Sequence, residues 1–256
     1  MKKNKIILYA GKRFGNQVLK YMINSHPPEY LIPNLDDKGK DNNLYESTIK
    51  IAKKAGLKIL NNKKLLKLCE KNTYDYIICA GTTIIIPKEI LNACKKGAIN
   101  FHPSLLPKYR GRYSTVHAIF NGEKISGVTC HWINSEIDKG QIINQKKIKI
   151  ENFHTAKDLY ENFTDEAFKL FKIIFKKILN NKKINSKKSI FSTKYEKKNF
   201  PNKGEIDWNW NGKKILNFIR SMTYEPFEPP NFKLGKKKYY IVEEKLLKKN
   251  FLKSPK

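Results

Sequence analysis

Residues 5–25 read KIILYAGKRFGNQVLKYMINS. Residues 5–10 form an apolar run of the length expected for a buried strand, and Gly11 and Gly15 bracket a predicted turn. Residues 16–25 place apolar side chains at helical spacing and predict a short helix. A strand, a glycine-containing turn and a helix in this order are typical of the opening of an α/β fold.

The same alternation continues over roughly the first 150 residues. The expected helices are 47–55, 63–71, 87–95 and 113–120, and the expected strands are 57–60, 76–80, 98–102, 126–133 and 141–150. This order predicts an α/β protein with a Rossmann-like, mostly parallel sheet. In such sheets, ligands bind at the carboxyl ends of strands, which here are near residues 10, 80 and 102.

A long helix is predicted over residues 155–179, where Thr155 and Asp158 resemble a capping box. Residues 180–188 are rich in Lys and Asn and are interpreted as a linker. A small α+β unit follows, with a helix near 214–222 and a β-hairpin that turns near 234–236. The expected division is a catalytic domain over residues 1–180, and a linker with a small C-terminal domain over 181–256.

Charge is the most unusual feature of the composition. The chain has 256 residues, of which 52 are Lys or Arg and 23 are Asp or Glu, for a net charge of +29. Only four of the basic residues are Arg, the side chain that phosphate and base recognition favours. We therefore expect a solvated, lysine-rich surface rather than a nucleic-acid site, and the same field would attract a small anionic substrate.

Other classes of protein are disfavoured by hydropathy and by cysteine spacing. No apolar run approaches the ~18 residues of a membrane-spanning helix, so no membrane association is expected. The four cysteines lie far apart without a C-x-x-C pair, which argues against a zinc site or a disulfide scaffold. Reduced thiols and a cytoplasmic location are expected.

The most informative segment is Gly97–Gly111, with sequence GAINFHPSLLPKYRG. Asn100 and His102 are two residues apart at a strand end, so their side chains share one face of the sheet. A histidine exchanges protons near neutral pH, and an asparagine amide can donate to a developing oxyanion. By spacing alone, a strand-end histidine that is bonded to the backbone is an equally good interpretation.

A second segment, residues 127–143, is interpreted as a strand, a polar loop and another strand. Asp138 lies in the loop, two residues before Gly140, and could orient His102 or accept a proton through water. Taken alone, Asp-x-Gly usually marks only a turn. His131 alternates within the first of these strands and is as consistent with a structural role as with a functional one.

Together the two segments resemble the folate-dependent formyltransferases, which include glycinamide ribonucleotide, methionyl-tRNA and sugar N-formyltransferases. That family has Asn-x-His, then Ser-Leu-Leu-Pro and an Arg-Gly run, and an Asp about 36 positions after the His. Asn100, His102 and Asp138 occupy all three places, with 36 positions between the last two. The resemblance covers residues 70–180 well and the first 70 weakly.

The resemblance implies formyl transfer from N10-formyltetrahydrofolate to an amine, with no metal. Asn100 would donate to the oxyanion, His102 would carry the proton, and Asp138 would stabilise the imidazolium. The cofactor-binding residues would be Thr83, Ile84, Ile85, Ile86, Ser135, Glu136 and Asp138. A purely structural role in the core remains an alternative for the three isoleucines.

The acceptor is expected to be a nucleotide-linked amino-dideoxysugar, such as dTDP-4-amino-4,6-dideoxyglucose or GDP-perosamine, for surface glycan or O-antigen synthesis. Methionyl-tRNA formyltransferases carry a complete C-terminal barrel, whereas only residues 189–256 follow the linker here. The closest resemblance is thus to sugar N-formyltransferases, which often form homodimers. A methionyl-tRNA formyltransferase-like enzyme without a full C-terminal domain is the alternative.

Candidate substrate contacts come from three places. Tyr224 and Phe227 could stack on a nucleobase near Arg220, or could simply pack the small domain. The other candidates are Lys12, Arg13 and Asn16, at a helix start, and Ser104, Tyr109 and Arg110, in the segment after His102. A catalytically silent nucleic-acid-binding protein of the same fold is a different hypothesis, and the complete set of Asn100, His102 and Asp138 argues against it.

Overall fold

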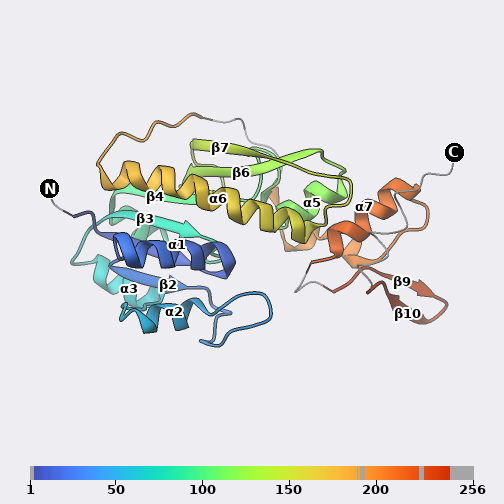
Figure 1. Cartoon of the computed structure of the whole chain (residues 1–256), viewed down its shortest axis with the longest axis horizontal. Coiled ribbons are helices and arrows are strands. Elements are labelled where there is room, and N and C mark those ends of the chain that lie inside the picture. The colour runs from blue at the N-terminus through green and yellow to red at the C-terminus, as the bar shows by residue number, and fades with distance from the viewer. Residues whose placement is uncertain (1–2, 189, 191–193, 225–227, 243–256) are drawn as a thin grey trace. The chain divides into compact units, whose positions relative to one another are not determined.

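The computed structural model describes residues 3–188, 190, 194–224 and 228–242 (Figure 1). The chain forms two compact units, each built from several segments. The first unit contains residues 1–102, 129–145 and 164–189. The second unit contains residues 103–128, 146–163 and 190–256.

A six-stranded sheet has the strand order β2-β1-β3-β4-β6-β7. Its strands are β1 (Ile6–Ala10), β2 (Tyr30–Pro33), β3 (Tyr74–Ala80), β4 (Cys94–His102), β6 (Ile125–Trp132) and β7 (Ile142–Lys149). The pairs β1–β2, β1–β3 and β3–β4 are parallel, and β4–β6 is antiparallel. The predicted α/β class with a mostly parallel sheet is confirmed.

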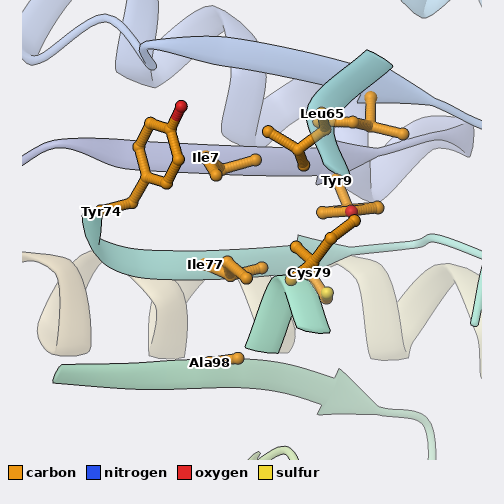
Figure 2. Close-up of a cluster of buried hydrophobic side chains, with 9 residues drawn as sticks. Ile7, Tyr9, Leu65, Tyr74, Ile77, Cys79 and Ala98 are labelled. Atoms are coloured by element: carbon orange, nitrogen blue, oxygen red, sulfur yellow. The ribbon is translucent and has the colours of Figure 1, made fainter. Parts of the chain in front are cut away.

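Helices supply apolar side chains to both faces of the sheet in the first unit. These helices are α1 (Lys12–Ser25), α2 (Thr48–Lys54), α3 (Asn62–Cys69), α4 (Lys88–Asn92) and the later turns of α6 (Ala156–Leu179). On one face, side chains of β1, β3 and β4 pack with Leu65 of α3 (Figure 2). On the other face, Phe101 of β4 meets Phe14 of α1 and Phe171 of α6 edge-on. Burying each of these large side chains contributes about 1.5–3 kcal/mol relative to exposure.

The turn predicted between Gly11 and Gly15 is wrong, because helix α1 begins at Lys12. The Gly11 N–H donates to Ala80 O, and the Gly15 N–H donates to Gly11 O, which closes the first helical turn. A Cβ atom on Gly15 would lie 2.6 Å from the oxygen of Ala80. The glycines therefore serve a close approach between α1 and β3, not a loop.

Three further differences from the predicted elements concern short segments. The strand β2 is only four residues long and has no local signal strong enough to identify it. The strand predicted over 57–60 is instead a single bridge between Leu31 and Ile59. Helix α4 ends at Asn92, because the chain already enters β4 at Cys94.

The second unit contains α5 (Ser114–Phe120), the first turns of α6, α7 (Gly212–Met222) and the hairpin of β9 (Asn231–Leu234) and β10 (Lys237–Tyr240). A two-stranded parallel pair, β5 (Arg110–Gly111) with β8 (Lys194–Tyr195), and the short 3-10 helices Lys197–Asn199 and Pro201–Gly204 complete it. Phe120 of α5 packs against Phe218 of α7. The hairpin is where the sequence predicts it, with Gly235 at a positive φ of 58° in the turn.

The predicted capping box of α6 is present. The Asp158 N–H donates to Thr155 Oγ1 at 3.2 Å, and the Thr155 N–H donates to Asp158 Oδ2 at 2.8 Å. These reciprocal bonds satisfy two backbone donors that a helix start leaves without intrahelical partners.

A buried histidine in the second unit makes the stability of the protein depend on pH. His117 lies against the Tyr195 ring, with 4.0 Å between ring centroids. Among the described residues, no group makes a hydrogen bond with its Nε2. Burial lowers the pKa of His117 from 6.5 to about 4. Between these values the unfolded chain binds a proton that the folded chain excludes, so stability falls as the pH drops from 6.5 to 4.

We therefore expect the melting temperature to fall between pH 6.5 and 4.5 by about 3 °C or more beyond the fall seen in a His117→Phe variant. Phenylalanine retains the aromatic contact but cannot bind a proton. Circular-dichroism melts of both proteins at the two pH values measure the difference. Equal losses in the two proteins would show that His117 is not responsible.

Candidate active site

The end of β4 presents two polar side chains on one face of the sheet. Ala98 belongs to the core cluster on that face, and Asn100 and His102 follow it at intervals of two residues. Phe101, between them, faces the other way, toward Phe14. His102 is only 4% exposed. The strand thus carries an amide and a nearly buried imidazole side by side.

The antiparallel neighbour β6 adds a second histidine, because Asn100 is paired in register with His131. Asn100 Nδ2 lies 3.3 Å from His131 Nε2, and His131 Nδ1 lies 2.8 Å from Trp132 O. A carbonyl oxygen only accepts hydrogen bonds, so the Nδ1 atom carries the proton of the neutral ring. In the neutral ring, the Nε2 atom then accepts from Asn100 Nδ2 and orients the Asn100 amide, whereas a proton on Nε2 would face Asp138 Oδ1.

The carboxylate of Asp138 reaches both histidines. Its Oδ2 lies 3.4 Å from His102 Nδ1, and its Oδ1 lies 3.5 Å from His131 Nε2. The Asp138 side chain is 11% exposed, and both rings are still less exposed. The three residues that the sequence singled out, Asn100, His102 and Asp138, are therefore brought together around one carboxylate, with His131 as a fourth member.

The loop that carries Asp138 is folded tightly back on β6. Asp138 adopts a positive φ of 52°, a conformation that aspartate tolerates better than most residues. The Trp132 N–H donates to Gln141 O at 2.9 Å, which closes the loop. A Cβ atom on Gly140 would lie 1.5 Å from the oxygen of Trp132, so only glycine fits at this position. This packing fixes where the carboxylate can lie.

His131 is the member of the site that sequence reasoning left undecided. The position of His131 in a strand predicts only on which face of the sheet its side chain lies. Which residue lies opposite depends on the partner strand and on its register. The signal would have been an antiparallel pairing of residues 98–102 with 129–133, which places position 131 opposite Asn100.

The proposed cofactor residues lie in two segments of the first unit. Cys79 of β3 is in register with Asn100, so the segment after β3 begins next to the strand end that carries Asn100 and His102. Within it, Ile84 and Ile86 pack against the core, whereas Thr83 and Ile85 are exposed. In the other segment, Ser135 and Glu136 are exposed, the Glu136 N–H donates to Asn134 Oδ1, and the Glu136 carboxylate pairs with Lys139.

The predicted phosphate contacts at the start of α1 lie in different environments. Lys12 adopts a positive φ of 60° at the first helical position. Arg13 is half-exposed and pairs with Asp165 at 3.4 Å. Asn16 is buried, where its amide donates to Glu46 O and accepts from Thr48 Oγ1. The Asn16 side chain therefore links α1 to the start of α2.

The remaining substrate candidates lie in the second unit. Ser104 Oγ donates to Lys108 O, and Tyr109 OH donates to Glu123 Oε1 at 2.9 Å. Arg110 lies in β5 and is 8% exposed.

Two aromatic candidates and Arg220 come from the end of α7 and the residues after it. The Arg220 guanidinium is also buried, and its Nη1 atom donates to His154 O at 2.6 Å. Tyr224 packs on Tyr160, with 5.5 Å between ring centroids. Phe227 lies outside the described residues.

Cysteine, histidine and acidic side chains are the usual protein ligands of a metal ion. Within the described ranges, no three or more His, Cys, Asp or Glu residues are grouped so that they could hold a metal ion. All four cysteines are free, and burial raises the pKa of the Cys94 thiol to about 12. None of the helices in the described part combines the length and the apolar character needed to cross a membrane.

Comparison with known proteins defines the family of this chain. Residues 30–173, more than half of the chain, match the family model described as formyl transferase. The chain therefore belongs to the formyl transferase family.

Individual relatives come from several branches of that family. The chain is 31% identical over 248 residues to the bifunctional polymyxin resistance protein ArnA of Wigglesworthia glossinidia brevipalpis, with 94% of this chain and 38% of that protein covered. It is 34% identical over 168 residues to the GDP-perosamine N-formyltransferase of Brucella melitensis, with 65% of this chain and 64% of that protein covered. The chain thus spans less than two thirds of these two relatives. Methionyl-tRNA formyltransferases are also among the relatives.

Among solved structures, the chain is similar to the N-formyltransferase of Helicobacter canadensis, which was crystallised with folinic acid and dTDP-3-aminofucose. The TM-score is 0.78 and the sequence identity is 26%, with 91% of this chain and 85% of that chain covered.

Proposed function

We propose that this protein transfers a formyl group from N10-formyltetrahydrofolate to the amine of a nucleotide-linked amino-dideoxysugar. The observation that carries the proposal is the convergence of Asn100 and His102 on Asp138, with 3.4 Å between His102 Nδ1 and Asp138 Oδ2. An amide donor, an imidazole and a carboxylate are the groups that acyl transfer to an amine requires.

Each side chain has a separate task in this reaction. The folate co-substrate supplies a formyl group activated for transfer. Asn100 donates from its amide to the formyl oxygen, where negative charge develops. His102 passes the proton that the amine loses to the nitrogen that leaves. Asp138 stabilises the positive charge on His102 while the ring holds that proton, and His131 keeps the Asn100 amide in place.

The segment after β3 fits a flat heterocycle such as the pterin of folate. Ile84 and Ile86 tie it to the core, while the Ile85 side chain is 74% exposed and offers an apolar surface. Thr83 through Ile86 would hold the ring, with Ser135, Glu136 and Asp138 in the second segment. The same interpretation is supported by the folinic acid in the Helicobacter canadensis enzyme.

The amino-sugar acceptor is supported by two of the relatives, which act on or bind nucleotide-linked amino sugars according to their names. Lys12 and Arg13, at the start of α1, are the proposed contacts for a phosphate group. We also propose that Ser104, Tyr109, Arg110, Arg220, Tyr224 and Phe227 contribute to acceptor binding. We further propose that the protein is a cytoplasmic homodimer that serves surface glycan synthesis; the four free cysteines fit a reducing compartment.

The alternative acceptor is methionyl-tRNA, which the net charge of +29 and the methionyl-tRNA formyltransferase relatives favour. A single assay separates the two acceptors. Purified protein and N10-formyltetrahydrofolate are mixed with dTDP- and UDP-linked 3-amino and 4-amino sugars, a GDP-linked 4-amino sugar, or charged methionyl-tRNA. We expect tetrahydrofolate release with one nucleotide sugar. Turnover with methionyl-tRNA alone would overturn the proposed acceptor.

A further inference from the structure

The segment that follows β3, residues 81–87, has no regular secondary structure, yet side chains from two other elements hold its backbone. Its apolar anchors, Ile84 and Ile86, only press it against the core and do not fix its position along the sheet edge. Directional contacts to the backbone come from two asparagines, Asn34 and Asn62, that no sequence motif identified.

Asn34 follows the last residue of β2 and is 3% exposed. Its Nδ2 donates to Gly81 O at 3.1 Å, and its Oδ1 accepts from the Thr83 N–H at 2.9 Å. One amide therefore pairs with both backbone groups, as a neighbouring strand would. A Cβ atom on Gly11 would lie 2.0 Å from Asn34 Nδ2, so the amide packs directly against Gly11.

Asn62, the first residue of α3, holds the other end of the segment. Its Nδ2 donates to Ile85 O at 3.2 Å, and its Oδ1 accepts from Tyr9 OH at 2.8 Å. Tyr9 is fully buried in β1 (Figure 2). Burial raises the pKa of Tyr9, so its hydroxyl stays protonated and remains a donor. Because the Tyr9 hydroxyl donates to Asn62 Oδ1, the oxygen of the Asn62 amide must face Tyr9. The NH2 group of Asn62 is then directed at Ile85 O.

We propose that Asn34, Asn62 and Tyr9 form an amide clamp that positions residues 81–87 for the pterin ring of the folate co-substrate. This inference rests on the proposed function, in which Thr83 through Ile86 line the pterin. The three residues are positioning residues, because they hold the backbone of the segment and need not touch the ligand. The clamp uses the Thr83 N–H and one lone pair each of Gly81 O and Ile85 O, so a ligand can reach only the second lone pairs of these oxygens or other backbone groups.

The test replaces each asparagine by aspartate, which keeps the size and the acceptor but removes the donor. In Asn34→Asp, a carboxylate oxygen faces Gly81 O. We expect the KM for N10-formyltetrahydrofolate and the Kd for folinic acid to rise about tenfold, because a hydrogen bond is lost and two acceptors are opposed. For Asn62→Asp and Tyr9→Phe, the expected rise is about threefold. Asn62→Asp opposes a carboxylate oxygen and Ile85 O where solvent screens the pair, and Tyr9→Phe removes one hydrogen bond.

Asn72→Asp is the matched control. Asn72 follows α3 at its other end, and its exposed amide also donates to a backbone carbonyl, Leu68 O, at 3.1 Å. Both folate constants should stay within about twofold of the parent protein, as for an ordinary surface substitution. In the clamp variants, the KM for the amino sugar should change no more than in this control. Asn34→Asp should also lower the melting temperature, because it buries a carboxylate opposite Gly81 O.

Folinic acid binding, measured by isothermal titration calorimetry, separates the possible failures. If the parent protein binds folinic acid and the clamp variants bind it equally well, the clamp is overturned and the proposed function stands. If the parent does not bind it, the proposed function fails, and the clamp fails with it. Equal losses toward folate and toward the amino sugar would identify a structural role only. Should Asn34→Asp not fold, the milder Tyr9→Phe still decides.

Discussion

Replacing His102 with asparagine is expected to lower kcat/KM about 100-fold or more while the protein remains folded, as for loss of a general acid–base group. The asparagine amide can still donate toward Asp138, which lies 3.4 Å from His102 Nδ1 in the parent protein. It has no ring nitrogen that can carry a proton between the two nitrogens. Steady-state release of tetrahydrofolate with the preferred acceptor measures the loss, and folinic acid binding should be nearly unchanged.

His26→Asn provides the control for this substitution. His26 is another buried histidine of the first unit, and its Nε2 lies 2.8 Å from Asn4 O. Loss of this contact should lower the melting temperature while kcat/KM stays within about threefold of the parent, because His26 caps the end of α1 and not the site. If His102→Asn kept normal turnover, or if both variants lost activity alike, His102 would not be the proton carrier.

Replacing Gly140 with alanine should abolish most activity without changing any of the proposed catalytic side chains. The new Cβ atom would lie 1.5 Å from the oxygen of Trp132, so the backbone of the loop must move. Asp138 is two residues away and would move with it. A displacement of about 1 Å in a catalytic group can cost on the order of 100-fold in rate, and we expect a loss of kcat/KM of about that size.

The matched control is Gly212→Ala, at the first position of α7. Nothing lies within 4 Å of a Cβ atom there, so this variant should be neutral or slightly more stable. The double variant His102→Asn/Gly140→Ala gives a second test. If Gly140 acts by positioning Asp138 against His102, the double variant should lose little more activity than His102→Asn alone. Fully multiplicative losses would mean that the loop serves another step.

Parts of the fold that depend on residues close together in the sequence could be predicted from the sequence. The buried run that became β1, the capping box of Thr155 and Asp158 and the hairpin turn at Gly235 are all encoded within a few residues. Asn100 and His102 share a face for the same reason, since side chains in a strand alternate with a period of two.

Contacts between distant segments account for what the sequence did not show. Helix α1 begins at Lys12 because Gly11 and Gly15 meet the end of β3, some 65 residues further along the chain. β2 is too short for a pattern of its own and exists because it pairs with β1. The asparagines of the amide clamp resemble ordinary turn and helix-start residues until the segment after β3 is placed beside them.

The sequence by itself determined the α/β class, the strand end with Asn100 and His102, and Asp138 as their partner through a family resemblance. Only the tertiary structure decided that His131 joins them and that Gly140 sets the position of the carboxylate. The physical reason is that a side chain's face and a turn's propensity are local properties. Strand register and close backbone packing are fixed by whichever remote segment the chain folds against.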